Sequence, residues 1–140
     1  MTAPHFRRVT GYPVYSYLNS SGALAASAST TYTLPSGPGE FIGFGILKYG
    51  GLDSDFQLLG IQIWVDSSLV YNNFLCVLAS MNLTYSGHQM HATHDIQTAD
   101  LASFSYRSRF GYETSCILVF TNTSAASLDL AIGVHSRRGA

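Results

Sequence analysis

The sequence predicts an all-β fold, a single jelly-roll or β-sandwich of about eight antiparallel strands. Apolar and polar side chains alternate with a period of two in most segments, which is typical of strands with one buried face. Clusters of Gly, Pro, Ser and Asn separate these segments and predict turns. No segment has the convincing apolar period of an amphipathic helix.

The clearest strand is "LDLAIGVH" near the end of the chain. His135 lies on its predicted outer face. The predicted inner face carries Leu128, Leu130, Ile132 and Val134.

A β-hairpin is predicted from "GIQIWVDSSLVYNNF". Ile61 and Ile63 share one face of its first strand, and Gln62 and Trp64 share the other. The turn falls at residues 66–68, where Asp and Ser supply turn chemistry.

Two further strands, "FIGFGIL" (41–47) and "CILVF" (116–120), are apolar on both faces. Such strands need cover on both sides. In a chain of 140 residues, we expect another subunit to provide the second cover. Gly43 and Gly45 leave room on one face of the first strand.

Strands are also predicted at 12–18, 28–34 and 75–83, with turns at "SSG", "PSGPG", "YGGLDSD" and "NTSAAS". The segment 97–109 fits either a helical turn or a loop with a short strand. Residues 1–140 are predicted to form one domain with short N- and C-terminal arms.

Only 11% of the residues are charged, against about 25% in typical proteins. Either the surface is rich in hydroxyl groups, or other subunits cover it, since interfaces are depleted in charge. The many aromatic residues favour the second interpretation. The net charge of −1 predicts no sequence-specific nucleic-acid binding. The absence of a long apolar run predicts no membrane association, and the start of the chain lacks the pattern of a secretory signal.

The basic pairs Arg7–Arg8 and Arg137–Arg138 lie near the two ends. They are either solvated termini or groups that reach an acidic neighbour. Cys76 lies in an apolar run, as does Cys116, and such cysteines are usually small buried hydrophobes.

The segment "YSGHQMHATHDIQ" holds His88, His91 and His94. A zinc site needs three or four ligands at about 2.0–2.3 Å, and neither a helix nor a strand brings all three rings together. The His-x-His pair of cupin metalloenzymes is absent. We therefore predict no metal and no cofactor, and keep a cupin-type metalloenzyme as an alternative. A further hypothesis puts these histidines at a subunit boundary that loosens in mild acid.

Two carboxylates, Asp53 and Asp55, lie in the glycine-led loop "GGLDSDF". A calcium loop requires more oxygen ligands than follow here, so a solvated turn is favoured. No nucleophile elbow and no phosphate-binding loop occurs. We predict that the protein is not an enzyme.

Exposed aromatic residues support a rival function. Tyr12, Tyr15 and Tyr17 cluster near the start of the chain, and Trp64 lies opposite the isoleucines of its strand. Such side chains serve subunit interfaces, cores or sugar-binding faces. Low charge and two-sided apolar strands favour the interface.

The order of the elements resembles that of small jelly-roll virion structural proteins of bacteriophages and related viruses, of the decoration, cement or minor capsid type. The resemblance is carried by "PGEFIGFGIL", by "IQIWVDSSLVYNN" and by the late strands joined through "TNTSAAS". It implies a structural protein of the virion, made in the host cytoplasm, that decorates or cements a capsid or an attached tail structure.

The leading hypothesis is a homo-oligomer, with a trimer favoured, that also contacts other virion proteins. The alternative is a carbohydrate-binding β-sandwich module, for example of a viral receptor-binding protein. The predicted interface residues are Trp64, Gln62, Phe41, Phe44, Cys116, Leu118, Phe120, Arg7, Arg8, Arg137 and Arg138.

Overall fold

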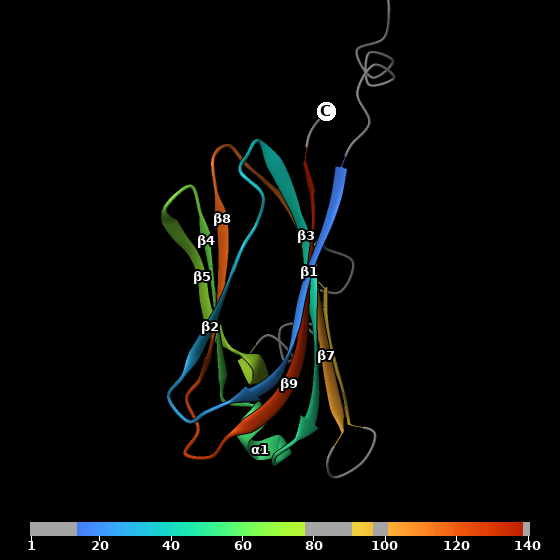
Figure 1. The fold of residues 1–140 in the computed structure, drawn as a ribbon, viewed down its shortest axis with the longest axis vertical. Coiled ribbons are helices and arrows are strands. Elements are labelled where there is room, and N and C mark those ends of the chain that lie inside the picture. Colours follow the sequence, from blue (N-terminus) through green and yellow to red (C-terminus); the bar gives the residue numbers. More distant parts are fainter. Residues whose placement is uncertain (1–13, 78–90, 97–100, 139–140) are drawn as a thin grey trace, which may run out of the picture.

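The computed structural model describes residues 14–77, 91–96 and 101–138. Nine strands within these ranges form two facing antiparallel sheets, the short helix α1 (Asp53–Phe56) lies at one end of the sandwich, and residues 75–77 are also helical (Figure 1). The five-stranded sheet has the order β1 (Val14–Leu24), β9 (Leu128–Arg138), β3 (Gly39–Gly50), β7 (Ala102–Tyr112), β6 (His91–Ile96). The four-stranded sheet has the order β2 (Ser29–Thr33), β8 (Cys116–Asn122), β4 (Leu59–Val65), β5 (Ser68–Phe74).

The strand order is that of a jelly roll. The first strand pairs with the last, β1 with β9, and the second pairs with the last but one, β2 with β8. The inner pairs β3–β7 and β4–β5 complete the pattern, and β6 adds one strand beyond β7. This arrangement confirms the predicted fold class. No helix in the described ranges is long and apolar enough to cross a membrane.

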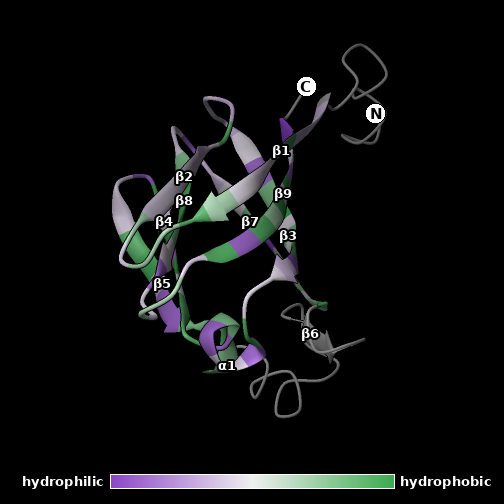
Figure 2. Cartoon of the chain, turned by 60° about the horizontal axis from the view of Figure 1, so that its bottom comes forward, coloured by the Kyte–Doolittle hydropathy of each residue, from purple (hydrophilic) through white to green (hydrophobic). Residues whose placement is uncertain are grey.

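The core lies between the sheets and is built by the alternate side chains of each strand. Strand β9 shows this alternation as hydrophobic and hydrophilic segments (Figure 2), and its four predicted inner residues are all buried. Phe44 of β3 joins the two layers: its ring centroid lies 5.1 Å from that of Phe120 in the opposite sheet and 5.3 Å from that of Tyr106 in its own. Aromatic contacts at these distances stabilise the packing of sheet on sheet.

The hairpin β4–β5 forms as predicted, with a two-residue turn at Asp66 and Ser67. Both residues have positive φ angles, 50° and 69°, as a type I′ turn requires. Asp and Asn enter this backbone region more readily than most residues. The sequence signal at residues 66–68 therefore identified the hairpin correctly.

Three predicted boundaries were wrong. The "SSG" segment is not a turn, because β1 runs through residues 20–22. Of the segment 97–109, residues 102–109 belong to the 11-residue strand β7 inside the five-stranded sheet and not to a helical turn or a short strand, and residues 97–100 lie outside the described part. Its frequent serines hid the alternation of buried Ala102, Phe104 and Tyr106. Residues 75–77 form no strand, and residues 78–83 lie outside the described part.

The carboxylate of Asp66 ties the β4–β5 turn to the connection between β7 and β8. It accepts hydrogen bonds from the backbone N–H groups of Glu113 (3.0 Å), Thr114 (2.8 Å) and Ser115 (3.1 Å). The Thr114 hydroxyl donates a fourth, at 2.9 Å. The N–H groups of Thr114, Glu113 and Ser115 hold the pKa of this carboxyl well below its usual range, because they bind its charged form.

Asn122 likewise joins separate chain segments by hydrogen bonds, at the other end of the sandwich. Unlike that of Asp66, its side chain lies in the interior. Its amide nitrogen donates to the carbonyls of Leu24 (2.9 Å) and Ala126 (2.8 Å), and its oxygen accepts from the N–H and hydroxyl of Ser124. The side chain is fully buried and its polar atoms are satisfied. Although Asn122 begins an Asn-x-Ser glycosylation pattern, the amide is enclosed and used by the fold.

Candidate functional site

The outward side of the four-stranded sheet carries no charged side chain. None of the residues of β2, β4, β5 and β8 is Asp, Glu, Lys, Arg or His. We call this side the neutral face. Its outward residues form three rows across the sheet: Thr33, Ile117, Trp64 and Leu69; Thr31, Val119, Gln62 and Asn72; Ser29, Thr121, Gly60 and Phe74.

Apolar side chains on the outermost strand of this face are open to water. Leu69, Val70 and Phe74 of β5 are 42%, 54% and 42% exposed. The outer edge of β5 pairs with no other described strand, and the strand contains no Pro. Edge strands of proteins that remain single are normally protected by charge, Pro or cover. Within the part of the chain that the structure describes, this edge therefore lacks the usual protection against pairing with another chain.

Trp64 and Gln62 lie on the neutral face, half-buried and side by side. The indole Nε1 donates a long hydrogen bond of 3.4 Å to Oε1 of Gln62. Ile61 and Ile63, the alternate residues of β4, are buried in the core. The predicted division of this strand into two faces is thus correct, and the interface role of Trp64 and Gln62 stays a prediction.

Phe41 and Phe44 do not lie on the outward side of β3. Both are buried, because the register of β3 shifts between Phe41 and Gly43 and turns both phenyl rings towards the core. A β-bulge of this kind breaks the simple period of two. The outward positions are instead held by residues such as Gly45 and Leu47.

Cys116, Leu118 and Phe120 are likewise enclosed by their own chain, with no exposed surface. They form the inward side of β8, whereas Ile117 and Val119 form its outward side. The second apolar side of "CILVF" is therefore part of the neutral face. Burial raises the pKa of the Cys116 thiol to about 12. Neither Cys116 nor Cys76 forms a disulfide.

The basic residues near the ends have different surroundings. Arg137 forms an ion pair with Glu40 of β3 at 3.2 Å, and Arg109 of β7 approaches the same carboxylate at 3.7 Å. Arg138 is exposed at the end of β9. Arg7 and Arg8 lie outside the described residues. The described acidic partner of Arg137 thus belongs to its own chain.

The candidate metal ligands do not form a described site. His88 lies outside the described residues; His91 and His94 belong to strand β6, but their side chains lie outside the described part. Asp53 and Asp55 occupy the only turn of α1 rather than an open loop. Among the described residues, no three His, Cys, Asp or Glu side chains gather as metal ligands would.

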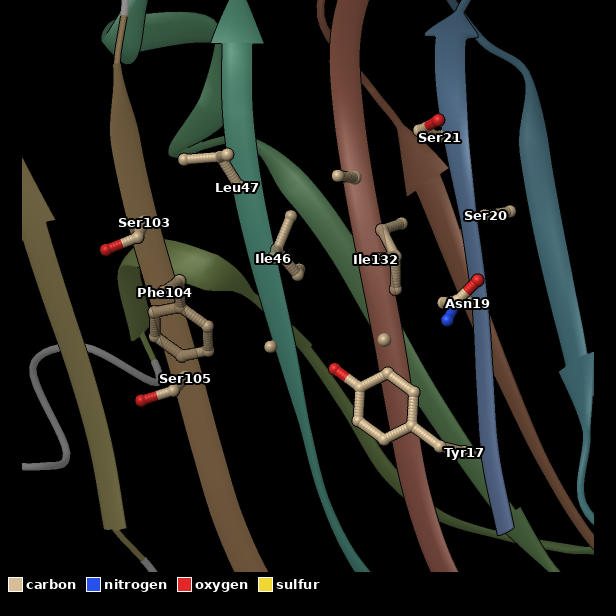
Figure 3. Close-up of a pocket in the computed structure, with 13 residues that line it drawn as sticks. Tyr17, Asn19, Ser20, Ser21, Ile46, Leu47, Ser103, Phe104, Ser105 and Ile132 are labelled. Atoms are coloured by element: carbon tan, nitrogen blue, oxygen red, sulfur yellow. The ribbon is translucent and has the colours of Figure 1, made fainter.

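The outward side of the five-stranded sheet contains a shallow hollow of about 580 Å³ (Figure 3). Tyr17 of β1 bounds it, and its ring lies over the Cα of Gly133 in β9. Gly45 of β3 forms part of the floor, and a Cβ there would meet nothing within 4 Å. The polar side chains around the hollow are Tyr17, Asn19, Ser21, Ser103 and Ser105, whereas the Ser20 hydroxyl hydrogen-bonds that of Tyr32 in the other sheet.

A second hollow of about 290 Å³ lies on the other side of Tyr17 and shares Gly45, Gly133 and Ser105 with the first. Arg107 and His135 line it. The imidazole of His135 lies near Tyr17, with ring centroids 6.0 Å apart. The prediction that His135 faces away from the core is correct. The aromatic cluster predicted from Tyr15 and Tyr17 lies on this face; Tyr12 lies outside the described residues.

The sequence indicated only part of this hollow. The room above Gly45 was predicted from the strand "FIGFGIL", and the tyrosines from their clustering. The meeting of Gly45 with Gly133 requires the register between β3 and β9, which places these two residues opposite each other. No local pattern contains that pairing.

No family model and no curated protein matches this chain. A solved structure that is similar is the crystal structure of the STIV MCP, a viral major capsid protein. The sequence identity is 12% and the TM-score is 0.45. The likeness covers 89% of this chain and 48% of that chain, so this chain spans about half the length of the STIV MCP.

Proposed function

We propose that this chain is a structural protein of a virion, which assembles as a homo-oligomer and decorates or cements a capsid or an attached tail structure. The observation that carries the proposal is the neutral face, a sheet side with a half-buried tryptophan, exposed apolar residues and no charge. Interface centres are depleted in charge and enriched in aromatic residues in the same way.

A second copy of this chain is the occupant that fits the neutral face. Because this face carries no charge, a copy packed on it buries no unpaired charge of the face and meets no like charge there, either of which would oppose association. Hydroxyl and amide groups of Thr31, Gln62 and Asn72 supply hydrogen bonds between the copies. The exposed side chains of β5 supply apolar area.

The size of the face indicates that its edge takes part. Strands spaced by about 4.8 Å, with seven residues rising about 3.3 Å each, give a face of roughly 20 by 20 Å. A standard interface buries about 800 Å² on each partner. The flat outline of the neutral face gives roughly half of that area, so the free edge of β5 and its apolar side chains must add to the contact. A closed ring, with a trimer favoured, uses both the face and the edge.

The virion role rests on the fold class. Jelly rolls build viral capsid proteins as well as lectin domains and cupins, and a fold alone does not define which. Within this set, the low charge of the chain and its neutral face favour a capsid protein, because capsid proteins assemble. We further propose that residues 1–140 form one domain with short terminal arms. Arg7, Arg8 and Arg138, which lie in or near these arms, contact other virion proteins.

The mass of the purified full chain in solution tests the assembly. We expect one closed oligomer from about 1 to 100 µM, by light scattering and native mass spectrometry. Gold-labelled antibody against the chain should also mark intact virus particles in electron micrographs. A monomer throughout this range would contradict the assembly, and unlabelled intact particles would contradict the virion role.

A further inference from the structure

We propose that the outward side of the five-stranded sheet binds an acidic carbohydrate across Tyr17. This site lies on the other side of the sandwich from the neutral face and does not depend on the proposed assembly. The ligand class follows from the two hollows on either side of the tyrosine ring, which differ in chemistry.

The tyrosine ring provides the platform. Tyr17 is 61% exposed, although it lies against the sheet over Gly133, where no side chain lifts it away. A Cβ at position 133 would collide with the ring, so glycine is needed for this pose. The C–H face of a sugar ring packs on such an exposed aromatic surface, while its hydroxyl groups remain free for polar contacts.

The larger hollow supplies those polar contacts. Its volume of about 580 Å³ lies within the range of about 300–1,000 Å³ that is common for small-molecule sites. Asn19 and Ser21 lie on β1, and Ser103 and Ser105 lie on β7, so amide and hydroxyl groups border it from two strands (Figure 3). Each can both donate and accept a hydrogen bond, which matches the hydroxyl groups of a sugar.

The smaller hollow supplies a cation. Arg107 is exposed there and forms no ion pair with any residue that the structure describes, unlike Arg109 and Arg137, which share Glu40. A guanidinium group binds a carboxylate through two parallel hydrogen bonds. A sugar carboxylate beside Tyr17 would place its charge at Arg107 and its hydroxyl groups in the larger hollow. Sialic and uronic acids have this combination.

Glycan arrays and NMR titration of the full chain test the site, with sialylated, uronic-acid, sulfated and neutral oligosaccharides as probes. We expect carboxylated glycans to bind best. Tyr17→Ala should weaken binding at least about tenfold, since the platform is lost. Gly45→Thr should also weaken binding, because Gly45 lines both hollows and the new side chain would project into open space beside Tyr17. Tyr49→Ala, an exposed tyrosine of the same sheet outside both hollows, is the matched control.

Arg107→Gln tests the acidic class separately. We expect affinity for carboxylated glycans to fall about tenfold, with neutral glycans unaffected, because charge-assisted hydrogen bonds are lost. Absence of binding by the native chain would overturn the site, as would unchanged binding by Tyr17→Ala and Gly45→Thr. Equal affinity for neutral and carboxylated glycans, or a preference for sulfated ones alone, would overturn the carboxylated class. Oligomer mass, measured on the same samples, reports on the neutral face independently.

Discussion

Both sheets of the sandwich are antiparallel, but their outward surfaces differ. Within the described residues, the five-stranded sheet carries Glu40, Arg109 and Arg137 as an ion-paired group, whereas the four-stranded sheet carries no charge. The neutral face has exposed apolar groups and an unprotected edge, and the opposite face has an aromatic platform beside polar hollows. The two sides of the sandwich thus differ in charge and polarity, which suits the neutral face to the proposed contact between copies.

Removal of the contact that joins the sheets should have the largest effect on stability. Phe44 packs on aromatic rings of both layers, so Phe44→Ala should lower the free energy of unfolding by about 3–5 kcal/mol. Tyr17→Ala, on an exposed ring, should change it by less than about 0.5 kcal/mol. Urea denaturation checks both. Similar losses in the two variants would contradict the assigned core.

The buried amide of Asn122 should come next. Asn122→Ala removes the amide donor to the carbonyls of Leu24 and Ala126 and the acceptor of the Ser124 N–H. The hydroxyls of Ser124 and Ser127 still reach the two carbonyls, at 2.9 and 3.4 Å, and each buried group left without a partner costs about 1–3 kcal/mol. We expect a total loss of about 2–4 kcal/mol in thermal or urea unfolding. Asn19→Ala, an exposed asparagine of β1 in the other sheet, is the control and should have little effect. A loss in Asn122→Ala no greater than in the control would refute the role of this amide.

The Asp66 carboxylate and the three backbone N–H groups that it binds, which we call the clasp, should make the stability of the fold depend on pH. Because the folded pKa is lowered, this carboxylate stabilises the fold above its unfolded pKa of about 3.9. That contribution is lost progressively as the pH falls below this value towards the folded pKa. Asp66→Asn should therefore be less stable than the native chain at pH 7, and the difference should shrink between pH 5 and pH 2. Urea midpoints at several pH values test this, and a constant difference would argue against the clasp.

The smallest effect concerns the chemical reactivity of ionisable groups on the inward side of the four-stranded sheet. Burial raises the pKa of Cys116 and of Tyr71 to about 12, so both stay neutral near pH 8. In a Cys76→Ser background, Cys116 should react with a thiol reagent only after unfolding. Mass spectrometry of the labelled protein measures this. Rapid labelling of the folded chain would show that the reagent reaches the inward side of this sheet.

The fold was largely predictable from the sequence because burial of one sheet face imposes a period of two. The pattern identified β9 and the β4–β5 hairpin, including its turn at Asp66. It failed where a local irregularity intervenes: the bulge after Phe41 turns Phe44 inward as well, and the serines of β7 conceal its buried face. The local sequence contains no signal for the bulge or for the buried face of β7.

The candidate surfaces were predictable only in part. Trp64 and Gln62 were correctly assigned to one side of their strand. The clasp joins Asp66 to Thr114, and the hollow joins Gly45 to Gly133, so both depend on the pairing of segments that are distant in sequence. Phe41, Phe44 and the inward residues of β8 were assigned to an interface because a two-sided apolar strand does not reveal which side faces the core.

The most direct test of the neutral face compares the oligomer mass of two lysine variants. Gln62→Lys puts a charge at the middle of the neutral face, and Ser103→Lys puts the same charge on the outward side of the other sheet. We predict that Gln62→Lys is a folded monomer in native mass spectrometry, because a buried unpaired lysine opposes association. Ser103→Lys should keep the mass of the native oligomer. An unchanged oligomer in Gln62→Lys, or dissociation in Ser103→Lys alone, would contradict assembly through the neutral face.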